Sequence, residues 1–326
     1  MEIERYKHLN KYLKNKFGER TLKICIDGGF TCPNRDGTIS TNGCIFCSNK
    51  GSGEHIENFM KKHSSEENIF SSDCTILKIQ LQSIKTQISN FFNSYKSERA
   101  NKFIAYFQNF TNTYDSIENL KAKYNSALCD NRIVALAIAT RPDCINEDVC
   151  KLLTSYKEKV DIWVELGLQT SNDETGKLIN RGYSSTCFSK AVELLNKYNI
   201  DIVTHLMIGL PNESFEDIKN TVTFINNHNI QGLKIHSTYI VENTVLAEMY
   251  KKREYTPITL KFYLETASYI LTHINPNIII HKISGDAPKD LLVAPEWNSH
   301  KKWIINGLNK YLKENNLFQG MYFQNY

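Results

Sequence analysis

Long apolar runs, a secretory leader pattern and low-complexity tracts are all missing from this 326-residue chain. Because no stretch of about 18 consecutive apolar residues occurs, a membrane span is excluded at the level of sequence. The N-terminal segment MEIERYKHLN is acidic and polar where a secretory leader would become apolar. The nine cysteines are an odd number, which agrees with free thiols. We therefore expect a cytoplasmic protein in a reducing compartment, with no membrane contact.

A strong excess of one charge is absent too. The formal net charge is +4 at pH 7, with 23% charged and 41% hydrophobic residues. These values suit a chain with a sizeable core and do not suggest a disordered or fibrous protein. Lysines gather at 7–23 and 251–253, and either group taken alone is typical of a solvated surface. At this length we expect one large domain with appendages.

Strand-like and helical segments alternate along most of the chain. The strand-like runs are 22–27, 102–108, 133–140, 161–169, 201–209 and 232–237. The helical segments are 77–95, 115–129, 146–156, 186–198 and 214–227, with Asn146 and Ser214 as candidate caps. This alternation is typical of an α/β fold with a parallel sheet. Six units are too few for a closed eight-fold barrel, so we predict an open six-stranded (β/α)6 partial barrel with its chemistry at the C-terminal ends of the strands.

The predicted organisation has three parts. Residues 1–20 form an N-terminal helix, 21–240 the barrel core and 241–326 a C-terminal α/β extension. The extension contains a helix at 258–274, a strand at 277–283 and a helix at 301–315. We expect it to close the open side of the barrel or to present a surface to a partner. Residues 50–73 are polar without a period and are expected to form a loop.

The loop after the first strand contains the highest density of candidate metal ligands. Cys25, Cys32, Cys44 and Cys47 fall within 23 residues, and the last two form a C-x2-C unit. Soft thiolates at this density predict a metal. Four thiolates could close around zinc in a structural site. Three with an open position would instead suit a four-iron cluster that must bind a ligand.

Six motifs, in order, resemble one family. They are CPNRDGTISTNGCIFC, AYFQNFTNTY, ATRPDC, VELGLQT, INRGY and HLMIGLPNES. The chain resembles the radical S-adenosylmethionine (SAM) proteins of the YtqA/YhcC type, relatives of the radical SAM domain in the catalytic subunit of Elongator. The resemblance implies one [4Fe-4S] cluster held by Cys32, Cys44 and Cys47, with SAM at the open iron and no ligand role for Cys25. It also implies reductive cleavage of SAM to a 5′-deoxyadenosyl radical, and adenine packing against Phe46.

Further cofactor contacts are expected from five residues. Gln108 and Asn109 end the second strand, where the wider superfamily has a glycine-rich turn near the methionine part of SAM; this chain has QNFTNT. Glu165 and Gln169 are four apart on one strand and so share a face, and an otherwise apolar strand would bury both. The oxygen-independent coproporphyrinogen oxidases hold SAM with a Gln and an Arg twelve residues later. Gln169 and Arg181 keep that spacing.

Two residues are candidates for contact with the substrate. Cys144 in ATRPDC is a candidate thiol hydrogen donor, with a structural role as its alternative. His205 should face the barrel interior if it alternates with Met207, and it is either catalytic or a satisfied core histidine. Lys234 and His236 are weaker candidates of the same kind.

The resemblance implies tRNA as the substrate. Similar, MnmL-like proteins act on wobble uridine and convert a 5-carboxymethylaminomethyl group to aminomethyl, with a one-electron donor such as flavodoxin or ferredoxin. The sequence itself offers basic patches and the aromatics Tyr183, Trp297 and Trp303 for RNA binding. Two alternatives stay open at this point: a radical SAM enzyme acting on a small molecule or a protein, and a zinc-stapled RNA-binding module without catalysis.

Overall fold

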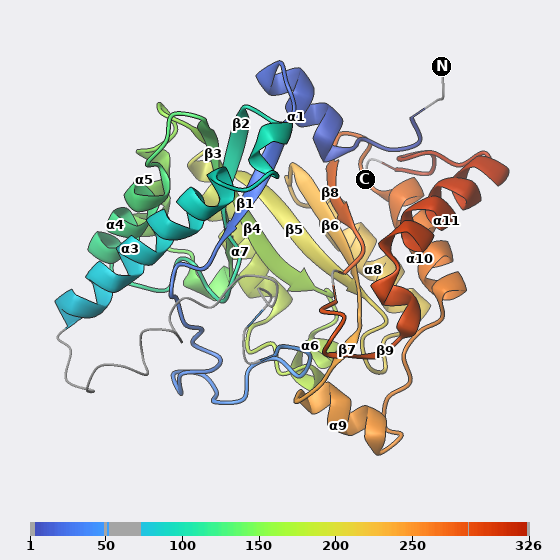
Figure 1. The fold of residues 1–326 in the computed structure, drawn as a ribbon. Helices are drawn as coiled ribbons and strands as arrows, with labels where there is room; N and C mark the ends of the chain where they lie inside the picture. The colour runs from blue at the N-terminus through green and yellow to red at the C-terminus, as the bar shows by residue number, and fades with distance from the viewer. Residues whose placement is uncertain (1–3, 49–50, 52–72, 286, 325–326) are drawn as a thin grey trace.

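A single sheet of seven parallel strands organises the chain. The computed structural model describes residues 4–48, 51, 73–285 and 287–324 (Figure 1). The sheet has the order β1-β2-β3-β4-β5-β6-β8. Its strands are β1 (Thr21–Ile26), β2 (Lys102–Phe107), β3 (Ile133–Thr140), β4 (Asp161–Gln169), β5 (Asp201–Ile208), β6 (Gly232–Ser237) and β8 (Ile279–Ile283). It curves into the predicted partial barrel.

Helices cover the outer, convex face of this sheet. They are α3 (Asp73–Phe92), α4 (Ile117–Ala127), α5 (Glu147–Thr154), α7 (Ser185–Lys197), α8 (Phe215–Asn226), α10 (Leu260–His273) and α11 (Lys301–Glu314). Asn146 and Ser214 cap α5 and α8 as expected. None of the helices in the described residues combines the length and apolar character needed to cross a membrane.

The prediction of a partial barrel is confirmed, and the structure adds to it. The strand expected within the C-terminal extension, β8, joins the main sheet in parallel beside β6, so the extension supplies a seventh strand. Two short helices, α6 (Asp173–Leu178) and α9 (Val245–Lys251), were not predicted because six or seven residues are too few to show a helical period. The same holds for the small antiparallel pair β7 (Ile240–Val241) and β9 (Leu292–Ala294). The expected loop at 50–73 lies almost wholly outside the described residues.

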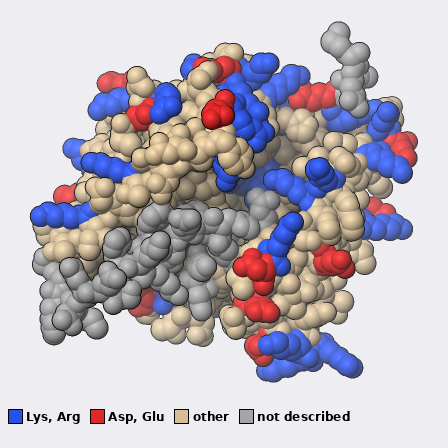
Figure 2. All heavy atoms as spheres, in the orientation of Figure 1, with Lys and Arg blue, Asp and Glu red and all other residues tan. Residues whose placement is uncertain are grey.

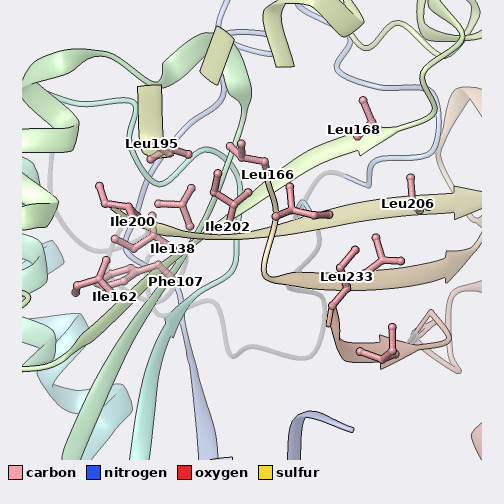
Figure 3. Close-up of a cluster of buried hydrophobic side chains, with 14 of the residues drawn as sticks. Phe107, Ile138, Ile162, Leu166, Leu168, Leu195, Ile200, Ile202, Leu206 and Leu233 are labelled. Carbon is pink, nitrogen blue, oxygen red and sulfur yellow. The ribbon is translucent and has the colours of Figure 1, made fainter. Parts of the chain in front are cut away.

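Side chains alternate between the two faces of each strand. Outward-facing residues such as Phe107, Ile138, Leu166, Ile202 and Leu233 join the main hydrophobic core with the helices (Figure 3). The residues between them face the concave side, which we call the lumen. Because both faces are covered, the strands read as apolar runs in the sequence.

Helix α1 (Leu9–Phe17) closes the N-terminal end of the lumen. Its buried Leu9 and Leu13 pack with Ile104, Trp163 and Val203 in a separate hydrophobic cluster. The segment before α1 covers the edge of β8, because the backbone N–H of Ile280 donates to the carbonyl of Lys7 (2.8 Å). The described residues therefore close the N-terminal end of the lumen with apolar side chains.

Shortening a buried side chain of α1 should measure how much its packing contributes to the free energy of unfolding. Leu13→Ala is expected to lower the free energy of unfolding by about 2–5 kcal/mol, because Leu13 is 3% exposed and its loss leaves a cavity. Lys14→Ala on the exposed side of α1 is the matched control and should change little. Denaturant unfolding measures both. Equal stability of the two variants would show that α1 does not seal the barrel.

Candidate active site

One cavity of about 820 Å³ lies at the C-terminal ends of the strands and reaches into the lumen. The loop at 27–48 crosses these strand ends (Figure 1). Its three motif cysteines, Cys32, Cys44 and Cys47, line the outer part of the cavity, and charged residues line the inner part. In the space-filling view, Lys and Arg side chains border a hollow near the centre of the molecule (Figure 2).

The cysteine loop is held in shape by its own backbone. The N–H of Arg35 donates to the carbonyl of Cys32 (2.8 Å), and the N–H of Cys47 donates to that of Cys44 (2.9 Å). The Arg35 guanidinium donates to the carbonyls of Cys47 (3.2 Å) and Ser48 (2.8 Å). At Gly43 φ is +70°, and a Cβ there would meet the Arg35 side chain at 2.8 Å. Glycine is therefore required for the close approach between these two parts of the loop.

The three motif thiols offer the donor set of a cluster with one open position. Soft thiolates are the ligands of iron–sulfur clusters, and three of them leave one iron of a four-iron cluster for a further ligand. Among the described residues, no group of three or more His, Cys, Asp or Glu side chains is arranged around one metal ion. The side-chain amide of Asn34 lies 3.8 Å from Cys44 Sγ as a donor. Burial raises the pKa of Cys44 to about 11, so a ligand thiolate there needs a cation beside it.

The INRGY motif anchors the cysteine loop to β4. The carbonyl of Ile179 accepts from the N–H of Ile45 (3.1 Å), and the Asn180 side chain donates to the carbonyl of Gly43 (2.6 Å). In return the Asn34 side chain donates to the carbonyl of Asn180 (2.6 Å). Two segments far apart in the sequence thus meet at the cavity, and the motif sets the position of Cys44.

Arg181 lies behind the cavity wall. Its guanidinium is fully buried and donates to the carbonyls of Leu168 (2.7 Å), Thr170 (2.6 Å) and Tyr183 (2.9 Å) and to Asp173 (2.8 Å). These bonds fix the chain on both sides of Gln169. Arg181 is not among the residues that line the cavity, and its contacts support Gln169; direct contact of Arg181 with the cofactor stays a prediction.

Gln169 itself lines the cavity. Its backbone is left-handed (φ +61°) at a register shift between β4 and β5, and its Oε1 accepts from the Tyr183 hydroxyl (3.1 Å). A non-glycine residue held in this region costs about 1–3 kcal/mol and often marks a functional site. At Gly167, a Cβ would meet the Gln169 amide at 2.5 Å.

Phe46 and Gln108 also line the cavity, while Asn109 is buried and does not. The Oδ1 of Asn109 is buried and has no hydrogen-bond partner among the described residues. The apolar Phe46 and the polar Gln108 and Gln169 together offer the mixed surface that a nucleoside with an amino-acid tail needs, and the volume suits such a ligand.

Glu165 is the centre of the inner cavity. Its carboxylate is completely buried and accepts from Lys23 (3.2 Å), Trp163 Nε1 (3.2 Å), His205 Nε2 (2.9 Å) and Lys234. Both oxygens are thus occupied by protein donors. A ligand that bound the carboxylate directly would have to displace one of them. Contact of Glu165 with the cofactor stays a prediction, and in this structure the carboxylate holds the surrounding side chains in position.

The electrostatics of this group follow from burial and from the neighbouring lysines and histidine. Burial alone would raise the pKa of Glu165, but Lys23, Lys234 and His205 outweigh it and hold the pKa well below its ordinary value. Burial lowers the pKa of Lys234 to about 7; Glu165 opposes this shift and Lys23 adds to it. Burial and Lys234 lower the pKa of His205 to about 4. His205 is therefore neutral at pH 7 and donates its Nε2 hydrogen to Glu165.

The two predicted substrate contacts lie in different places. His205 lines the cavity beside Glu165. Cys144 does not line it; its sulfur lies 3.9 Å from Asp143, and burial and Asp143 raise its pKa to about 12. The additional thiol in the cavity is Cys25, on β1. Strand alternation could have revealed it, since Cys25 is two residues from Lys23 on the same face.

Several lining residues were missed or underrated. Lys23 was interpreted as part of a solvated lysine group, Lys282 was not singled out, and Tyr106 lies within an apolar run, yet all three line the cavity. Arg141 lines it too and is held by Asp143 (2.7 and 2.9 Å) and by the carbonyl of Arg181 (3.0 Å). Tyr183 stacks its ring between Arg141 and Arg181 (4.7 and 4.9 Å).

Comparison with known proteins assigns the class. The model of the Radical SAM superfamily matches residues 36–225, and that of the Radical_SAM C-terminal domain matches 230–314. The chain therefore belongs to the radical SAM superfamily, whose members use a [4Fe-4S] cluster and SAM.

Within that superfamily, the chain is similar to several named proteins. It is 35% identical to YtqA of Bacillus subtilis over 98% of this chain and 94% of that protein. It is 32% identical to YhcC of Escherichia coli K12 over 93% of this chain and 90% of that one. A tRNA uridine(34) acetyltransferase of Methanocaldococcus infernus is 32% identical over 50% of this chain and 30% of its own length.

Among solved structures, the archaeal Elp3 of Methanocaldococcus infernus has the same fold. Its TM-score is 0.60 at 23% sequence identity, and the match covers 76% of this chain and 62% of that one. At this level of identity the likeness shows the fold alone.

The iron content of cysteine variants should distinguish the cluster ligands from the other thiol in the cavity. After anaerobic reconstitution, Cys44→Ala is expected to lose most of the roughly four irons per chain that the wild type binds, because a cluster with two thiolates is unstable. Cys25→Ala, which removes another thiol from the same cavity, should retain them. Iron and sulfide analysis with the visible spectrum is the measurement. Equal iron in both variants, or one tight zinc in the wild type, would contradict this ligand set.

The charge of Glu165 should be needed for stability. Glu165→Gln is expected to cost about 3–5 kcal/mol of unfolding free energy, because it leaves buried cations without their counter-ion. Adding Lys234→Met should recover part of the loss, which urea unfolding of the single and double variants measures. Because its folded pKa is depressed, the stabilisation from Glu165 is present above about pH 4.3 and is lost as pH falls through the folded value. Additive effects in the double variant would mean that the pair is not coupled.

Proposed function

We propose that the protein modifies the wobble uridine of tRNA, converting a 5-carboxymethylaminomethyl group to aminomethyl. The likeness to tRNA uridine(34) acetyltransferases over half of this chain carries the proposal, since that name places the substrate of those proteins at the wobble position. The cavity supports it, because a pocket of this volume can take a nucleoside beside a cofactor.

In this proposal Cys32, Cys44 and Cys47 hold the cluster and leave one iron for the amino and carboxylate groups of SAM. Phe46 packs against the adenine, and Gln108 and Gln169 bind polar groups of the cofactor. Asn109, with its buried unpartnered oxygen, supports the strand end behind Gln108. When bound and reduced, these cofactors supply a 5′-deoxyadenosyl radical able to take hydrogen from an unactivated carbon.

The overall reaction balances without a further oxidant. The group –NH–CH2–COO⁻ and water become –NH2 and glyoxylate, with release of two electrons and two protons. SAM takes up both electrons and one proton as it is split into methionine and 5′-deoxyadenosine. The residues of this chain position the substituent, and His205 orients the Glu165 group beneath it. Cys144 lies outside the cavity, so hydrogen donation from it is not required by this route.

The base must leave the anticodon stack to reach the cavity, as in other enzymes that act on a base. Trp303 is 54% exposed and stacks on His300 with ring centroids 4.0 Å apart. It is the best exposed platform of the three aromatics named from the sequence. Trp297 is instead partly buried and donates to the carbonyl of Ile258 (3.2 Å), and Tyr183 lines the cavity.

The competing substrate class is a small molecule or a protein. An RNA substrate should bind with a steep salt dependence, because each neutralised phosphate releases counterions. A small-molecule or protein substrate gives no reason for the wild type to bind tRNA in this way.

Nucleoside analysis of total tRNA tests the proposal. Cells without this protein should accumulate 5-carboxymethylaminomethyluridine and lose the aminomethyl form, as measured by liquid chromatography and mass spectrometry. The wild-type gene and Cys74→Ala, a change at an exposed thiol outside the cavity, should restore the pattern. Cys44→Ala should not. Unchanged nucleosides in the cells without the protein would rule out the wobble-uridine role.

A further inference from the structure

The side chain of Asn34 lies against a sulfur of the cysteine loop. Asn34 belongs to the turn that follows Cys32, and it is fully buried. Its Nδ2 lies 3.8 Å from Cys44 Sγ, in position to donate an N–H···S hydrogen bond. Contacts of this kind are longer than those to oxygen because sulfur is the larger atom. A neutral donor is thus directed at one of the three motif thiols.

The orientation of the Asn34 amide follows from its second contact. The same Nδ2 lies 2.6 Å from the carbonyl oxygen of Asn180. A carbonyl oxygen can only accept, so the atom that faces it must be the nitrogen and not the oxygen of the amide. The amide nitrogen has two hydrogens. One is donated to Asn180, and the other is available for Cys44 Sγ.

Both sides of this contact are held by the protein itself. The backbone carbonyl of Asn34 accepts from the N–H of Gly43 (2.7 Å), so the residue before Cys44 is tied directly to Asn34. On the opposite side, a Cβ at Gly182 would meet Asn34 Oδ1 at 3.1 Å, so the backbone there packs closely against the amide. The geometry of donor and sulfur is therefore fixed by the cysteine loop and the INRGY motif together.

The oxygen of the same amide supplies an independent observation. Asn34 Oδ1 is buried and has no hydrogen-bond partner among the residues that the structure describes. A buried acceptor without a partner costs free energy. Hydrogen bonds to a charged group are about twice as strong as those between neutral groups. Donation to a sulfur that carries charge offsets the cost of the oxygen, which donation to the neutral Asn180 carbonyl alone does less well.

A donor at a cluster ligand acts on the reduction potential of the cluster. Uptake of one electron makes the net charge of a [4Fe-4S] cluster more negative, and the ligand sulfurs carry part of the added charge. The donor then interacts more strongly with the sulfur than it did before reduction. Hydrogen bonds to the sulfurs therefore favour the reduced form and raise the potential.

We propose that Asn34 is a positioning residue that donates to the Cys44 thiolate when the cluster is bound and raises the reduction potential of the cluster. Reduction adds one electron from an external one-electron donor, and no bond is made or broken. A higher potential lets a given donor keep a larger fraction of the cluster reduced, which SAM cleavage requires. The inference rests on the radical SAM class of the chain and holds for any substrate.

Redox titration of the full chain with reconstituted cluster, in the absence of SAM, tests the proposal. Asn34→Leu removes the donor and keeps a similar size. At a fixed applied potential, its ratio of reduced to oxidised cluster should be about tenfold lower than in the wild type, a downward shift of about 59 mV for one electron. Electron paramagnetic resonance of the reduced cluster measures this ratio. A change of less than about threefold, with the iron content kept, would overturn the proposal.

Asn180→Gly is the matched control for a change in the position of the loop. It removes the side chain that donates to the carbonyl of Gly43 (2.6 Å) but keeps the backbone carbonyl that accepts from Asn34. Glycine also suits the left-handed backbone at Asn180 (φ +51°). The ratio in this variant should stay within about twofold of the wild type. A shift as large as that in Asn34→Leu would assign the effect to the loop and reject the hydrogen bond.

A measurement on the unaltered protein covers the case in which Asn34→Leu does not fold or does not bind iron. Asparagine isotopically labelled at its side-chain nitrogen is incorporated, and pulsed electron paramagnetic resonance of the reduced cluster detects nitrogen nuclei that share its spin density. The wild type should show a coupling to the labelled nitrogen, and the coupling should persist in Asn180→Gly. Its absence in the wild type, or its loss in Asn180→Gly, would overturn the role of Asn34.

Discussion

The carboxylate of Glu165 is the interaction on which the interior of this barrel depends. It is completely buried, and donors from β1, β4, β5 and β6 converge on it. An isolated ion at this depth would be prohibitively costly, so the carboxylate and the lysines require one another. Their mutual dependence ties four strands together across the lumen and keeps a polar space open above the hydrophobic plug of α1.

A second constraint acts at the strand ends. The motif INRGY joins the cysteine loop, the end of β3 and the end of β4 through Asn180, Arg141 and Arg181. The three thiols, Gln169 and Tyr183 are therefore positioned by one short segment. The two constraints act on opposite halves of one cavity: the motif orders the half with the cysteines, and Glu165 orders the half that is suited to substrate.

The strands were predictable nearly to the residue because parallel strands covered on both faces form apolar runs with sharp ends. The place of β8 was not predictable in the same way. Its sequence shows a strand, but its pairing with β6 depends on contacts far along the chain. The same reason explains why Lys23 and Lys282 were missed. Alternation shows which side of its strand each lysine faces, but not that both sides line one cavity.

The candidate site, like the fold, was predictable only in part. Motif spacing brought Cys32, Cys44, Cys47 and Gln169 to one cavity in the prediction, and the structure places all four there. It did not distinguish a residue that faces the cavity from one that supports the wall, as Arg181 does, because both roles demand the same spacing. Cys144 was predicted to contact the substrate but does not line the cavity, whereas Cys25, which was given no role, does. Cys144 lies in a turn after a strand, where the sequence does not show the direction of a side chain. Cys25 lies within a strand, where alternation does show it.

In the proposed function, this lumen presents the carboxymethyl carbon of a modified wobble uridine to the radical chemistry at the cysteines. The direct measurement uses tRNA with deuterium on that carbon, incubated without oxygen with the protein, SAM and reductant. Mass spectrometry of the released 5′-deoxyadenosine should show one transferred deuterium. Release of 5′-deoxyadenosine without deuterium, while the tRNA stays unchanged, would contradict the account.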